Sequence, residues 1–72
     1  MNNKNINHFD GLTIKSDSNI LLIKGSSNDL IELADLITKL ASEKTKGAHL
    51  HIDELTLLNK NSDFSEIIIE KE

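Results

Sequence analysis

The 72-residue sequence contains no cysteine, proline, tryptophan or tyrosine, and it has only two phenylalanines. Without cysteine, neither a disulfide framework nor a zinc site made of thiolates can form. With so few aromatic side chains, the core must be built mainly from leucine and isoleucine. A chain of this length forms one domain with a small core and marginal stability, which suits a protein stabilised by a partner or by a second copy.

Long apolar runs and an excess of basic residues are also missing. No stretch approaches the roughly 20 apolar residues of a membrane span, and residues 1–8 lack the apolar segment of a signal peptide. We therefore expect a cytoplasmic protein without membrane contact. Eight basic and twelve acidic residues give a formal net charge of -4. This charge opposes nucleic-acid binding and favours basic or metal-bearing partners.

The common catalytic motifs are absent as well. The chain has no cysteine nucleophile, no nucleophile elbow and no phosphate-binding loop, and its three glycines are placed as turn residues. A histidine and an aspartate with Ser62 or Ser65 could be imagined as a hydrolytic set, but so short a chain offers little concavity to exclude water. We predict that the protein is not an enzyme and needs no cofactor.

The first part of the chain predicts a β-hairpin. Residues 12–15 alternate between apolar and polar side chains, as a half-buried strand does, and four turn-forming residues follow at 16–19. Residues 20–24 are apolar at every position before Lys24, which is typical of a central strand covered on both faces. We therefore expect this second strand to lie inside the sheet.

Residues 27–44 carry the strongest periodic signal and predict an amphipathic helix. Ser26 and Asp29 have the spacing of a capping box, and Lys44 and Lys46 suit the negative end of the helix dipole. Seven apolar side chains gather on one side of the helix: Leu30, Leu33, Ala34, Leu36, Ile37, Leu40 and Ala41.

Two further strands are predicted after the helix, over about residues 48–53 and over residues 66–70. A long polar connection joins them. We expect three apolar residues to hold this connection against the core: Leu55, Leu57 and Leu58.

The order strand, strand, helix, strand, strand predicts an α+β fold. Its simplest packing is a four-stranded, mainly antiparallel sheet with one amphipathic helix on one face. We expect a single domain over residues 1–72, with residues 1–9 as a loosely ordered tail. Because one helix covers only one face of a sheet, part of the other face should remain open and partly apolar.

The run from His49 to Asp53 alternates strictly, so it places its polar and apolar side chains on opposite faces of a strand. Leu50 and Ile52 should face the helix. The open face should then combine polar groups with apolar residues of the second and last strands, a mixture typical of a protein contact. Six residues form this predicted partner-binding surface: His49, His51, Asp53, Glu66, Ile68 and Glu70.

Other readings of this surface stay open. Residues 1–9, with Ile6 and Phe9, could fold over it, or the histidines could only hold the strand register through hydrogen bonds. A third alternative is a metal site formed by His49, His51 and Asp53, because alternate strand positions can converge on one ion. His8 could then supply a fourth ligand.

The segment 47–53 after an amphipathic helix, followed by Leu57, Leu58, Ser62 and the closing segment 66–69, resembles the immunity protein 32 family of bacterial polymorphic toxin systems. The resemblance covers most of residues 11–70. It implies a small, non-catalytic α+β protein that binds and neutralises a toxin encoded beside it.

An acidic inhibitor would suit a basic, nuclease-type toxin, because opposite charges accelerate association. The alternative that the residues themselves leave open is a small metal-binding or homodimeric interaction domain that uses the same strand face.

Overall fold

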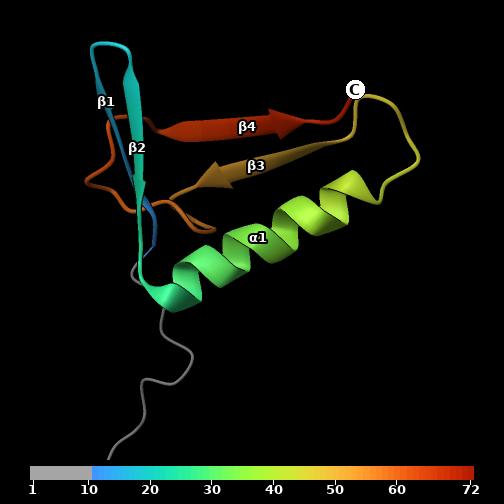
Figure 1. The fold of residues 1–72 in the computed structure, drawn as a ribbon, viewed down its shortest axis with the longest axis horizontal. Coiled ribbons are helices and arrows are strands. Elements are labelled where there is room, and N and C mark those ends of the chain that lie inside the picture. The colour runs from blue at the N-terminus through green and yellow to red at the C-terminus, as the bar shows by residue number, and fades with distance from the viewer. Residues whose placement is uncertain (1–10) are drawn as a thin grey trace, which may run out of the picture.

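The computed structural model describes residues 11–72, which form a mixed α and β fold (Figure 1). The element order is the predicted one, and the α+β class is confirmed. The elements are β1 (Thr13–Asp17), β2 (Ile20–Lys24), α1 (Ser27–Ala41), β3 (His49–Asp53) and β4 (Glu66–Glu70). The expectations about residues 1–9 and about His8 lie outside the described residues.

The strands form two separate antiparallel hairpins, so the prediction of a single four-stranded sheet is wrong. β1 pairs with β2, and β3 pairs with β4. Figure 1 shows the first hairpin standing across the end of the second, while α1 runs alongside β3. The two sheets stay apart because the chain between β3 and β4 occupies the outer edge of β1.

This connection binds β1 in place of a third strand. The amide of Leu12 donates to the carbonyl of Leu57 (2.6 Å), and the amide of Asp63 donates to the carbonyl of Ile14 (2.8 Å). Between them, the hydroxyl of Ser62 accepts from the amide of Ile14 (2.9 Å) and donates to the carbonyl of Leu12 (3.1 Å). With these groups satisfied, no edge of β1 is left for β4.

β2 differs most from its prediction. Its four apolar residues, Ile20 to Ile23, are between 43% and 67% exposed, whereas the sequence predicted a strand covered on both faces. β2 lies at the edge of its sheet, and within residues 11–72 only β1 pairs with it. It stays uncovered because the apolar side of α1 packs against β3 and the core instead.

The helix begins as predicted and ends at Ala41, three residues before the expected Lys44. Ser26 is the N-cap, and the capping box with Asp29 is present in both directions. The buried side of α1 is a narrow stripe made by Leu33, Leu36 and Leu40. No helix within residues 11–72 is long and apolar enough to cross a membrane.

The carboxylate of Asp29 is fully buried and joins three parts of the chain. Its Oδ1 atom accepts from the amide of Gly11 (3.3 Å), and its Oδ2 atom accepts from the amide (3.3 Å) and the hydroxyl (2.9 Å) of Ser26. A Cβ on Gly25 would lie 3.1 Å from the Cβ of Asp29 and 2.8 Å from Cδ2 of Leu12. A side chain at position 25 would therefore force Leu12 or Asp29 to move.

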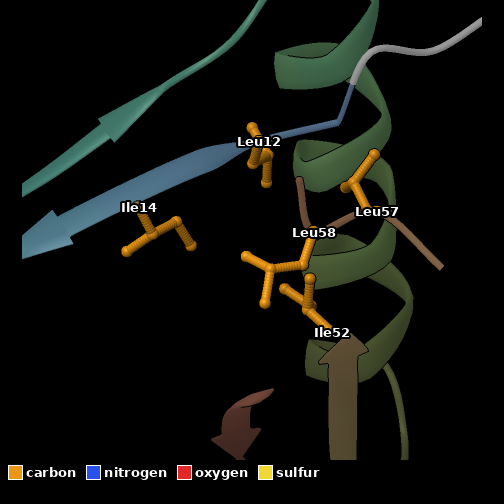
Figure 2. Packing of buried hydrophobic residues seen from close by; sticks show 5 residues of the cluster. All are labelled: Leu12, Ile14, Ile52, Leu57 and Leu58. Atoms are coloured by element: carbon orange, nitrogen blue, oxygen red, sulfur yellow. The ribbon is translucent and has the colours of Figure 1, made fainter. Parts of the chain in front are cut away.

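The core lies where β1, the end of β3 and the following connection meet α1 (Figure 2). Its fully or nearly buried members are Leu12, Ile14, Ile52, Leu57 and Leu58. The partly buried residues around it are Leu33, Leu36, Leu50, Ile67 and Ile69. Leu57 and Leu58 anchor the connection as predicted, but the expectation for Leu55 is wrong, because its side chain is 94% exposed.

Replacing Asp29 should destabilise the protein strongly. Asp29→Ala removes the N3 half of the capping box and leaves buried donors unsatisfied, so the free energy of unfolding should fall by about 2 to 3 kcal/mol. Asp29→Asn should lose less, because one side-chain oxygen still accepts. Urea unfolding measures both, and Asp35→Ala on the exposed side of the same helix is the matched control. Equal stability of Asp29→Ala and Asp35→Ala would contradict the role of the buried carboxylate.

Candidate functional site

The outer face of the β3–β4 hairpin gathers all six residues of the predicted surface. Leu50 and Ile52 face inward, so their neighbours in the alternating strand face outward. The same holds for β4, where Ile67 and Ile69 face inward. The outward residues form three cross-strand pairs, here called the histidine face: His49 with Glu70, His51 with Ile68, and Asp53 with Glu66.

The two histidines are held in place by different acceptors. Nδ1–H of His51 donates to the carboxylate of Glu66, its diagonal neighbour on β4 (2.5 Å). Nδ1–H of His49 donates to the carbonyl of Gly47 (3.1 Å). The two rings lie edge to face, with their centroids 4.8 Å apart. No contact of either Nε2 atom with a hydrogen-bonding group is found within residues 11–72, so both atoms can meet a partner.

Asp53 has a structural task that the sequence analysis missed. Its Oδ1 atom accepts from the amide of Leu55 (3.0 Å) and from the hydroxyl of Thr56 (3.3 Å). These bonds fix the turn that follows β3. Aspartate is a turn-forming residue whose carboxylate can bond the amide two positions on, so the sequence contained part of the information. Within residues 11–72, Glu70 therefore presents the one carboxylate of the histidine face that makes neither the bond to His51 nor the bonds to the turn.

An apolar side chain stands among these polar groups. Ile68 is 56% exposed and lies directly across from His51. Glu66 and Glu70 flank it on the same face. The expected apolar residues of the second strand do not join this surface, because β2 belongs to the other hairpin. The face is therefore acidic at its ends and apolar at its centre.

Comparison with known protein families finds a match over residues 20–72 to the family described as Immunity protein 32. The chain belongs to the immunity protein 32 family. The match contains β2, α1, β3 and β4, and with them the complete histidine face. The resemblance seen in the sequence is thus confirmed, although the match begins after β1. Searches of curated proteins and of solved structures give no match.

In this immunity protein 32 family member, the placement of the side chains does not support the alternative of a metal site. Within residues 11–72, no group of three or more histidine, aspartate or glutamate side chains is placed to hold a metal ion. Nδ1 of His51 bonds to Glu66, and Oδ1 of Asp53 bonds to the turn. Metal binding by His49, His51 and Asp53 therefore stays a prediction of the sequence.

A second exposed feature of this family member lies beside the histidine face. The turn fixed by Asp53 carries Leu55, which projects into solvent. Between α1 and β3 lies an open, mostly apolar pocket of about 320 Å³. Its lining residues are Glu32, Leu36, Leu50, His51, Thr56 and Leu57. The sequence analysis missed this pocket, because alternation along β3 says nothing about the gap between a strand edge and a helix.

Removing both histidines should change stability little. The pair of His51 and Glu66 is about half exposed, and exposed pairs contribute at most about 1 kcal/mol. The double variant His49→Ala/His51→Ala should thus unfold in urea with a free energy within about 1 kcal/mol of the original chain. The control is Ile52→Ala on the inner face of the same strand, which should lose about 3 kcal/mol.

A loss from the double histidine variant as large as that of the Ile52→Ala control would mean that the histidines hold the strand register. A small loss would leave the histidine face available for a partner.

Proposed function

We propose that the chain binds and neutralises a cognate toxin and that the histidine face is the surface that docks on it. Membership of the immunity protein 32 family supports the first part. The second part rests on one observation, which is that the outer face of β3–β4 presents an exposed isoleucine among carboxylates and histidines. Neutralisation by binding requires no catalytic group and no cofactor on the inhibitor.

The arrangement resembles the anatomy of a protein interface. Binding energy concentrates in a central buried side chain, while charged residues around it exclude water and select the partner. Ile68 has the central position, and Glu66 and Glu70 have the rim positions. The histidines add ring surface and the Nε2 atoms of His49 and His51.

The charge of the chain indicates the chemistry of the partner. With a net charge of -4, the protein attracts a basic surface at long range, and the carboxylates of β4 orient it on arrival. A toxin that cleaves nucleic acid carries such a basic surface, because it must bind phosphates. We therefore propose a nuclease-type toxin that is met in the cytoplasm, with the inhibitor covering its basic cleft.

Co-expression with the product of the neighbouring gene tests the function. A host killed by that product should survive when this chain is also present, and the two proteins should purify together. The control is the Asp29→Ala variant, which we expect to be destabilised and to protect less. Death of the host in spite of abundant folded chain, with no complex formed, would refute the proposed function.

Charge reversal on β4 tests the docking surface. Glu70→Lys should lower the association rate with the toxin by roughly tenfold at low salt, and the difference should shrink as salt screens the charges. Glu43→Lys is the matched control, because it makes the same change of net charge at an exposed position after α1. Stopped-flow or surface-based kinetics measures both rates.

Equal rates for Glu70→Lys and Glu43→Lys would mean that only net charge matters. The toxin would then dock elsewhere. Leu55→Ala tests the nearest alternative surface, the turn beside the pocket. A large loss of affinity in Leu55→Ala together with none in Glu70→Lys would move the interface from the histidine face to that turn.

A further inference from the structure

β2 combines two properties that isolated proteins seldom combine. Its four apolar residues, Ile20 to Ile23, are all exposed. Its outer edge pairs with no strand within residues 11–72. Exposed edge strands are usually protected by proline, a bulge or charged side chains, and β2 has only Lys24, at its end, while residues 20–23 contain no charge and no proline. The outer edge of β1 is covered by residues 57–63, so β2 is the unprotected edge of this hairpin.

We propose that β2 pairs antiparallel with β2 of a second copy, so that the two hairpins form one four-stranded sheet. A two-stranded sheet is marginal in water. Pairing at the edge would satisfy the outward backbone groups of β2 and let its apolar side chains pack against those of the second copy. The contact would be isologous, which requires β2 to be complementary to itself. This dimer uses the β1–β2 hairpin, whereas the histidine face belongs to the β3–β4 hairpin, so the proposal does not depend on the proposed function.

Symmetry restricts the register of such a pair. A twofold axis perpendicular to the sheet keeps the same faces on the same side, so the axis must lie midway between the two copies of one β2 residue, which are then directly opposed. An axis at Leu22 overlaps the whole strand. It places Leu22 opposite its own copy and Leu21 opposite Ile23 of the second copy, so the centre of the contact is entirely apolar.

The ends of the strand match in charge under this register. Lys24 of one copy lies opposite Ile20 of the other, and Ile20 is paired with Asp17 of its own hairpin. Lys24 of one copy and Asp17 of the second copy thus lie on the same face of the sheet. Their backbones are about 10 Å apart, a distance that a lysine side chain can bridge. An axis at Leu21 would instead place Lys24 opposite Ser18. The charges therefore favour the axis at Leu22.

Disulfide trapping tests the dimer without interference, because the chain has no cysteine of its own. Opposed residues of antiparallel strands have Cα atoms about 4.5 to 5.5 Å apart, which suits a disulfide. Leu22→Cys should therefore cross-link rapidly under mild oxidation. Ile20→Cys is the control on the same strand, because its two copies would lie about 13 Å apart. Leu55→Cys is the control for random collisions at a highly exposed site.

Light scattering supplies the second measurement. At about 100 µM, where weak interfaces still form, the original chain should have twice its mass of 8.0 kDa. Leu22→Lys should be monomeric, because it opposes two lysines, while Leu55→Lys should remain dimeric. Asp17→Lys and Lys24→Asp should each weaken the dimer by roughly three- to fivefold, and the double exchange should restore it.

A monomeric original chain, with Leu22→Cys cross-linking no faster than Leu55→Cys, would overturn the proposal. If Leu22→Lys then also abolished toxin binding, the occupant of β2 would be a strand of the toxin. Equally rapid cross-linking of Ile20→Cys and Leu22→Cys would overturn the proposed register.

Discussion

A buried carboxylate sets the geometry on which the other elements depend. Within residues 11–72, Asp29 is the one polar or charged residue that is buried, and a buried carboxyl group is tolerated only when hydrogen bonds replace its water. Here the donors come from Gly11, which precedes β1, and from Ser26, the residue before α1. The first turn of α1 is thereby fixed beneath β1. The helix then runs along β3 and leaves β2 open.

The sequence revealed the elements more fully than their pairing. Alternation and helical periodicity are local properties, and they located the capping box at Ser26 and the last strand correctly. The pairing depends on bonds that alternation does not encode. The hydroxyl of Ser62 and the carboxylate of Asp63 replace strand partners of β1, and nothing in a polar loop distinguishes such a role from ordinary solvation.

The histidine face could be predicted from the sequence, whereas the exposure of β2 could not. The histidine face followed from the period of two in β3 and β4, because each strand had a clear apolar side to bury. The apolar run Ile20 to Ile23 gave no such distinction between faces. An uninterrupted run is typical of a strand covered by its own domain, yet the same pattern arises in a strand that this chain leaves uncovered. The apolar run indicates that the strand needs a packing partner, but it does not distinguish a partner within the chain from one on another molecule.

The closure of β1 by residues 57–63 also governs how the chain reaches its fold. The bond between Ile14 and Ser62 joins residues 48 positions apart, whereas α1 and the first hairpin need only near neighbours. Such a distant closure forms late, because its loop entropy must be overcome first. A nascent chain on the ribosome therefore cannot close the edge of β1 until Asp63 has emerged. With no proline in the chain, no prolyl isomerisation delays folding after that point.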